Sequence, residues 1–248
     1  MKGQSRKLIS ALIGMGAAVL LAVTTSLPAT ADGAAVAVPA VSKSASQTKD
    51  TLAQMQGMVD RWRPLSVEVT RTLAQKARSL EAEQGGLRVD YSRASAWQVD
   101  RSTRVVRIPA ADGQPVLNES SLSVVFDESD AVVGTSEMIF TPVSEVSGRV
   151  QSWVDGALRL DQTVDAPGID ADAAFASRAY QKGDWWGNFN QCLSNAGIAS
   201  WVIAGIALAC SAICVVTVGA GCVACLGAAS AGFSGTVSFC ITTANLNS

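Results

Sequence analysis

The sequence predicts an α+β N-terminal domain, in which helices precede an antiparallel meander, followed by an all-α, hydrophobic, disulfide-stapled helical hairpin. Three observations support this fold class. Apolar residues first recur at helical spacing, and the period then changes to two. Residues 185–248 contain no Asp, Glu, Lys or Arg and hold all six cysteines. The chain therefore divides into a conventionally charged part and an uncharged, cysteine-containing part.

The overall charge argues against several classes of function. The net charge is −2 and the chain has no histidine. Without a basic patch there is little attraction for phosphates, so no nucleic-acid partner is expected. The lack of histidine removes the commonest general base and metal ligand, which excludes serine triads, Cys–His pairs and histidine zinc sites. We therefore expect no enzyme activity, no cofactor and no metal, although catalysis by carboxylates alone stays open.

Residues 1–31 are typical of a cleaved signal peptide. A basic start precedes the apolar residues 8–23, a run shorter than the roughly 20 residues of a full membrane span. The helix breaker Pro28 and the small residues that follow it favour cleavage between Ala31 and Asp32. An uncleaved anchor helix is the alternative. Cleavage predicts a secreted protein in an oxidising compartment.

Residues 32–47 are rich in Ala, Val and Ser and predict a flexible lead-in. The α+β domain is expected at residues 48–168. Its first helix should run from Thr48 until Pro64 interrupts it, and its second from Leu65 to a C-cap at Gly85-Gly86.

The alternating pattern beyond these glycines predicts the meander. Strands are expected at residues 97–99, 105–108, 122–126, 131–133, 138–140, 146–154 and 158–160. Asp155-Gly156 predicts a two-residue hairpin, because glycine tolerates the positive φ needed there. The acidic residues 127–130 lie between two strands, which favours a solvated turn over a metal loop. The domain therefore resembles a folding, binding or protective module.

Residues 169–184 are small, polar and charged, and they predict a linker with a processing site. Arg178 and Lys182 are the candidates for recognition by a trypsin-like protease. The sequence does not select the bond.

The uncharged residues 185–248 have features of a membrane-active segment. Trp185, Trp186 and Trp201 are candidate membrane-interface residues, since indole rings favour that boundary. Residues 198–218 form an uncharged run long enough to cross a bilayer as a helix. A turn at residues 219–221 and a second apolar piece at 222–232 would complete a hairpin. Membrane association is therefore expected through residues 198–232.

An even number of cysteines in an exported chain predicts a disulfide framework. Four of them form two pairs, each on one helical face, which two bridges across the turn would join; the outermost two would then tie the ends. A four-cysteine zinc site, a redox pair at Cys222 and Cys225, and a membrane anchor with incidental cysteines stay open as alternatives. The framework residues are Cys192, Cys210, Cys214, Cys222, Cys225 and Cys240.

These features resemble the halocin C-eight-like bacteriocin domain. The resemblance covers about the last 60 residues and rests on the cysteine layout, the Gly/Ala-rich composition and the exported precursor architecture. The residues that carry it are Asn190-Gln191-Cys192-Leu193, Cys210-x3-Cys214, Gly221-Cys222-x2-Cys225 and Ser238-Phe239-Cys240. It implies a released antimicrobial peptide and an N-terminal part that sequesters it as an immunity protein.

The physical chemistry of such a peptide is simple. Because it carries almost no side-chain charge, its affinity for a target-cell membrane would come from apolar burial at about 25 cal/mol per Å². Before release, the N-terminal domain would cover the apolar surface, within one chain or in a producer-cell complex. The competing hypothesis is a C-terminally membrane-anchored extracellular binding protein whose useful surface lies in residues 48–165.

Overall fold

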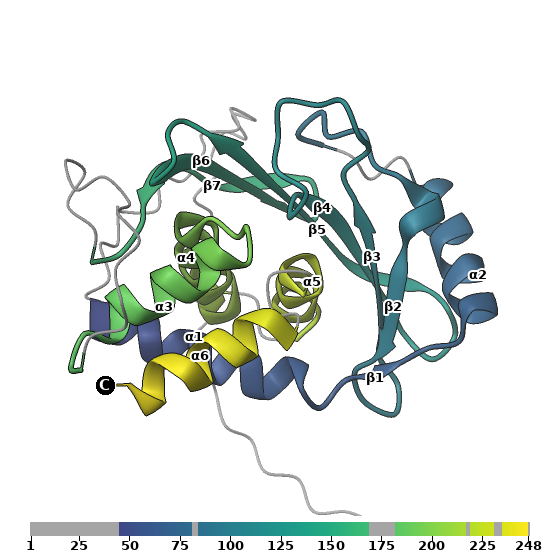
Figure 1. Ribbon diagram of the computed structural model, residues 1–248. Helices are drawn as coiled ribbons and strands as arrows, with labels where there is room; N and C mark the ends of the chain where they lie inside the picture. The colour runs from purple at the N-terminus through teal and green to yellow at the C-terminus, as the bar shows by residue number, and fades with distance from the viewer. Residues whose placement is uncertain (1–44, 81–83, 169–181, 217–218, 231–234, 248) are drawn as a thin grey trace, which may run out of the picture. The chain divides into compact units, whose positions relative to one another are not determined.

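A computed structural model describes residues 45–80, 84–168, 182–216, 219–230 and 235–247 (Figure 1). The signal cleavage position and most of the predicted lead-in and linker lie outside these ranges, but residues 45–47 of the expected lead-in are helical. From α1 to α6 the described elements pack as one compact unit. The change in charge at Asp184 therefore does not coincide with a break in packing.

Helices α1 (Ala45–Val59) and α2 (Val67–Arg78) occupy the two regions where helical spacing predicted them. The side chain of Ser66 caps α2 by accepting a hydrogen bond from the amide of Val69. The expected glycine C-cap is wrong, because α2 ends at Arg78 with Ser79 as its cap. Gly85 instead donates its amide to the Glu137 carboxylate, whose oxygens also accept the amides of Gln84 and Leu87.

Within the described residues, seven strands form one antiparallel sheet in sequence order, which confirms the predicted meander. Each strand pairs with its neighbours in the chain, so the sheet is built from local connections. The strands are β1 (Arg63–Pro64), β2 (Ser95–Gln98), β3 (Arg104–Pro109), β4 (Ser121–Phe126), β5 (Val132–Pro142), β6 (Ser147–Val154) and β7 (Ala157–Asp165).

The two turns singled out from the sequence are present. Asp155 and Gly156 join β6 to β7, and both have positive φ, as a tight hairpin requires. Residues 127–130 form a turn between β4 and β5 that the Asp127 carboxylate organises by accepting the amides of Ser129 and Ala131. These contacts satisfy that carboxylate within its own turn.

Strands β3 and β4 are buried on both faces of the sheet, and their side chains alternate between two cores. Val106, Leu122 and Phe126 pack with α2 on one face. Val105 and Val125 belong to the larger core on the other face, which includes the C-terminal helices. Figure 1 shows the sheet curving around α4 and α5, with α2 outside the curve. The sheet therefore separates a small outer core from a large inner one.

Four helices follow the sheet: α3 (Trp185–Asn195), α4 (Ser200–Val216), α5 (Ala220–Ala229) and α6 (Gly235–Leu246). Helix α4 covers residues 200–216 of the expected apolar run. The glycine-containing turn is shorter than expected, because α5 begins at Ala220 and its N-cap Gly219 has positive φ. The predicted helical hairpin is thus α4 and α5, with α3 and α6 added around it.

Candidate functional site at the interface between the sheet and the bridged segment

Residues 185–248, called the bridged segment below, are closed by three disulfides. Cys192 is bonded to Cys240, which joins α3 to α6. Cys210–Cys225 and Cys214–Cys222 are nested between α4 and α5, with Cα separations of 5.5 and 4.5 Å. All six predicted framework cysteines are used, and Cys222 and Cys225 bond to different partners. Every bridge therefore lies inside the segment, and none joins it to the sheet.

Helix α5 approaches the sheet closely because small residues face it. A Cβ on Gly227 would overlap Ser123 on β4 and lie 2.5 Å from Val105 on β3. A Cβ on Gly134 of β5 would lie 3.2 Å from that of Ala220. The backbone of α5 can approach the sheet this closely only where glycine is present, since a larger residue would displace its neighbour.

Helix α4 packs against the next strands through one large side chain. Trp201 is 1% exposed, and its ring lies over Gly148 of β6, where any Cβ would overlap it. The ring centroid is 6.2 Å from that of Phe140 on β5. One turn further along α4, Gly205 faces Val150 and Phe140. The indole thus fills a space that the sheet leaves open by having glycine there.

Two polar side chains of the sheet meet the end of α5. The carbonyl of Ala228 accepts Nε of Arg107 at 3.2 Å and Oγ of Ser121 at 2.9 Å. Arg107 also donates to the carbonyls of Asn118 and Glu119. Burial lowers the pKa of Arg107 from 12.5 to about 10, so it stays protonated at neutral pH. A cation at a helix C-terminus also suits the helix dipole.

Other polar groups on the same sheet face have no such partner. The hydroxyls of Ser123, Ser136 and Ser152 are buried and make no hydrogen bond with any described residue. A buried hydroxyl without a partner costs about 1–3 kcal/mol relative to its hydrated state. The sheet is therefore a less favourable cover for the helices than an all-aliphatic face would be.

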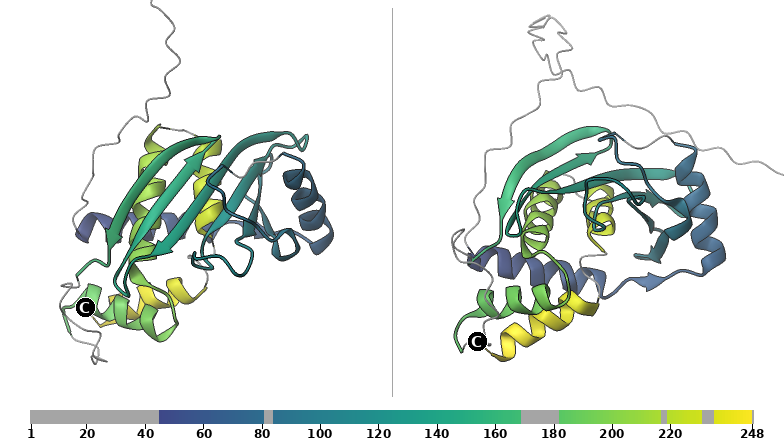
Figure 2. Two further views of the ribbon diagram at one scale, coloured as in Figure 1. Left: turned by 90° about the horizontal axis from the view of Figure 1, so that it is seen from above. Right: turned by 45° about the horizontal axis from the view of Figure 1, so that its top comes forward.

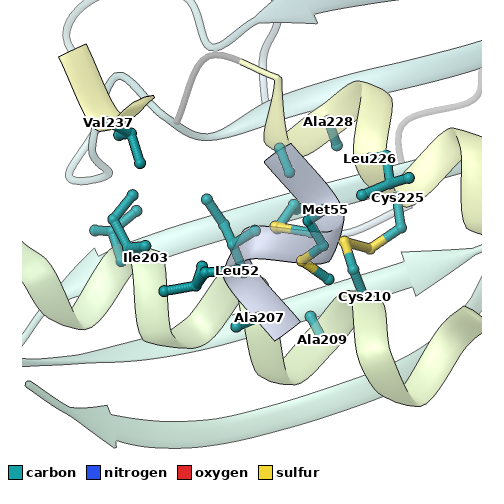
Figure 3. Packing of buried hydrophobic residues seen from close by; sticks show 14 of the residues in the cluster. Leu52, Met55, Ile203, Ala207, Ala209, Cys210, Cys225, Leu226, Ala228 and Val237 are labelled. Atoms are coloured by element: carbon teal, nitrogen blue, oxygen red, sulfur yellow. A yellow bond between two sulfur atoms is a disulfide. The ribbon is translucent and has the colours of Figure 1, made fainter. Parts of the chain in front are cut away.

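The N-terminal half also contacts the bridged segment from the side opposite the sheet. Leu52 and Met55 of α1 are buried among side chains of α4 and α5, as Figure 3 shows. The ammonium of Lys49 lies 4.8 Å from the centre of the Trp185 ring. Helices α4 and α5 are therefore enclosed between the sheet and α1.

The tryptophans proposed for a membrane interface are placed differently from one another. Trp185 and Trp201 are buried, and Trp185 donates Nε1 to Asn245 of α6 at 2.8 Å. Trp186 is half-buried, with its ring against that of Trp185. Lipid contact by Trp201 would therefore require α4 to leave the sheet.

Of the two predicted processing positions, only Lys182 is described, directly after residues 169–181, which lie outside the described ranges. Lys182 is exposed, whereas Arg178, Ala31 and Asp32 lie outside the described residues. The residues before the gap are held to α3, because Asn190 donates to the Pro167 carbonyl at 2.8 Å.

Several determinants of this interface were not identified from the sequence. Arg107 and Ser121 donate hydrogen bonds to Ala228 of α5, and Gly227 lets α5 approach the sheet. Arg107 does carry a signal, as a single cation inside the apolar strand 105–108. No sequence signal marks the role of Gly227, since glycine is frequent throughout the bridged segment.

Helix length and the placement of possible metal ligands bear on the expected membrane span and on the alternative of a zinc site. No single helix in the described ranges is both long enough and apolar enough to cross a bilayer. Helix α3 and residues 200–214 meet these criteria only as a pair, bent by 112°. In the same ranges no group of three or more Asp, Glu or Cys side chains could hold a metal ion.

Comparisons with known proteins give no further guide to the site. No family model, curated protein or solved structure matches this chain.

Proposed function

We propose that this chain is a secreted, bacteriocin-like antimicrobial precursor. Its bridged segment is the active part, and residues 48–168 are the escort that covers it. The observation that carries the proposal is that all three disulfides lie within the bridged segment. One cut in residues 169–184 would leave two chains held together only by non-covalent contacts.

The disulfides would stabilise the bridged segment after its release from the precursor. Short helices without charges do not hold a fold by themselves in water. Cross-links that join α3 to α6 and α4 to α5 limit the unfolded states open to the free segment. They would also protect it from proteases after release.

The packing of the sheet suits a cover that can be removed. It covers apolar residues of α4 and α5, including Trp201. It also buries three serine hydroxyls without partners, and these would regain water when the segment leaves. Hydration of these hydroxyls would therefore offset part of the free energy needed to separate the bridged segment from the escort.

The released segment would act on membranes by apolar burial. It has no Asp, Glu, Lys or Arg, so attraction to anionic lipids contributes little. Covering by the sheet and α1 before release would protect the producer cell. The same face, once vacated, would let residues 48–168 serve as an immunity module.

The test uses controlled cleavage of the secreted chain. A site for a sequence-specific protease is placed between Arg178 and Lys182, and a scrambled site serves as the matched control. After cleavage and separation without reductant, we expect a disulfide-intact C-terminal fragment that releases dye from phosphatidylcholine vesicles and inhibits sensitive cells. The scrambled control should do neither.

Two results would contradict the proposal. One is a released, correctly bridged fragment with no effect on vesicles or cells. The other is full-length protein that stays uncut and leaves the producer membrane only in detergent, which would support an anchored extracellular binding protein.

A further inference from the structure

Helix α6 exposes large apolar side chains on the side away from the core. Phe239 is 65% exposed and Leu246 is 81% exposed. They are two helical turns apart, and the exposed Thr236 and Thr242 lie on the same stripe. These four residues are called the outer face of α6. We infer that the outer face of α6 is a docking surface for an uncharged lipid surface.

The opposite side of α6 packs against the core. Val237, Cys240 and Ala244 are fully buried and face the core. No residue of α6 is charged, and Phe239 and Leu246 leave apolar surface on the side away from the core. In the part of the chain that the structure describes, only the inner side of α6 is enclosed, and Phe239 and Leu246 on the outer face stay exposed.

The surroundings of the outer face favour lipid of no net charge. Helices α3 and α6 lie side by side, joined by Cys192–Cys240, on the side of α4 and α5 away from the sheet (Figures 1 and 2). Neither helix contains a charged residue, so the face offers nothing to attract anionic headgroups. Phe and Leu flanked by threonine hydroxyls suit the boundary between acyl chains and zwitterionic headgroups.

A second copy of this chain is a poorer occupant. A 12-residue helix is about 18 Å long, and a strip about 10 Å wide on each partner would bury a few hundred Å² in total. Stable protein interfaces bury about 1,200 Å² or more. A lipid surface needs no such minimum area, because two or three inserted side chains can hold a protein at it reversibly.

This inference rests on the proposed membrane-directed function, but its test uses the secreted, uncut chain. The double variant Phe239→Ser with Leu246→Ser removes the apolar part of the outer face. The control is Val67→Ser with Val143→Ser, because those valines are 75% and 65% exposed and lie in α2 and beyond β5. Binding is measured by flotation with vesicles of phosphatidylcholine, with and without an anionic lipid.

We expect the unmodified chain and the valine control to float with phosphatidylcholine vesicles. The α6 variant should bind at least about tenfold more weakly, because it loses the burial of two large side chains. Anionic lipid should change binding less than about twofold. Circular dichroism and disulfide mapping show whether the variant keeps its fold.

Three outcomes would overturn the inference. They are no binding by the uncut chain, equal binding by the α6 variant, and a concentration-dependent dimer that the α6 substitutions abolish. In each case, dye release by the cleaved segment would still support the proposed function. Loss of dye release with α6-dependent binding retained would instead contradict the function and leave the docking surface in place.

Discussion

Arg107 and Ala228, 121 residues apart in the chain, are joined by a buried hydrogen bond from Nε to the carbonyl oxygen at 3.2 Å. It ties β3 to the last turn of α5, beside the hydrogen bond from Ser121 to the same oxygen. Most of the side chains around this contact are apolar. The contact therefore fixes where along the sheet α5 ends.

Replacing Arg107 with alanine should lower the free energy of unfolding by about 3 kcal/mol. The substitution removes hydrogen bonds from a charged donor to three carbonyls and leaves a cavity. Urea denaturation measures the change. Arg101→Ala, at an exposed position, should stay within about 0.5 kcal/mol. Equal effects of the two substitutions would show that the buried contacts of Arg107 contribute nothing.

Gly148→Ala should destabilise the fold by about 1–3 kcal/mol, because its methyl group would overlap the Trp201 ring. Adding Trp201→Leu should make the glycine substitution nearly neutral in that background, since the smaller side chain leaves room. Gly57→Ala in α1 is the control, because nothing lies within 4 Å of its new methyl group. A double-mutant cycle by thermal unfolding measures the coupling, and additive effects would refute the packing described for Trp201.

Removing the disulfides should have unequal effects. Cys192 and Cys240 are 48 residues apart, so the Cys192→Ser, Cys240→Ser variant should lose about 4 kcal/mol of stability. Removing Cys214–Cys222, with a separation of 8, should cost about 2.5 kcal/mol. Peptide mapping without reductant checks the disulfide pairing. Guanidinium titration checks that removing Cys192–Cys240 destabilises the fold more than removing Cys214–Cys222. Finding Cys210 bonded to Cys214 would contradict the structure.

Stability should fall in acid. Hydrogen bonds from Ser129 and Ala131 hold the pKa of Asp127 below 3.8, and a hydrogen bond from Arg149 does the same for Asp161. A carboxylate with a lowered pKa stabilises the fold above its unfolded-state value, and this contribution is lost as the pH falls through the folded-state value. The melting temperature should therefore drop as the pH falls from about 4 towards 2.

The acid effect can be assigned by substitution. Asp161→Asn should flatten the dependence of melting temperature on pH, since it removes one of the titrating groups. Glu145→Gln, exposed in the loop between β5 and β6, is the matched control. An unchanged profile in the Asp161 variant would rule out its contribution.

Local sequence patterns predicted much of the sheet. Alternation predicted β3, β4 and β6, and Asp155-Gly156 predicted the hairpin between β6 and β7. These features depend on neighbouring residues. The pattern divided β5 into two strands, since residues 134–137 are small or polar. The structure continues β5 through them: Ser136 is covered by the helical core, and the Glu137 carboxylate binds the amides of a distant loop. Those environments are not visible in a short window of sequence.

Helix α6 is not predicted by hydrophobic periodicity. Its apolar and its uncharged polar residues are spread around the helix, so no period of 3.6 stands out in residues 235–246. Packing against α3 and the bridge from Cys192 to Cys240 supply the stability that periodicity did not reveal. The exposure of Phe239 and Leu246 depends on which face of α6 packs against the core, and the sequence pattern does not show that face.

The sequence by itself determined the meander, its tight hairpin, the charge boundary near Asp184 and the use of six cysteines as a framework. These follow from spacing and composition, which act locally. Only the tertiary structure decided that Cys210 pairs with Cys225 and that the uncharged helices lie in the curve of the sheet. It also decided that Trp201 sits over Gly148 and Arg107 at the end of α5. Such choices depend on how side chains from distant parts of the chain fill a shared volume, and no short stretch of residues contains that information.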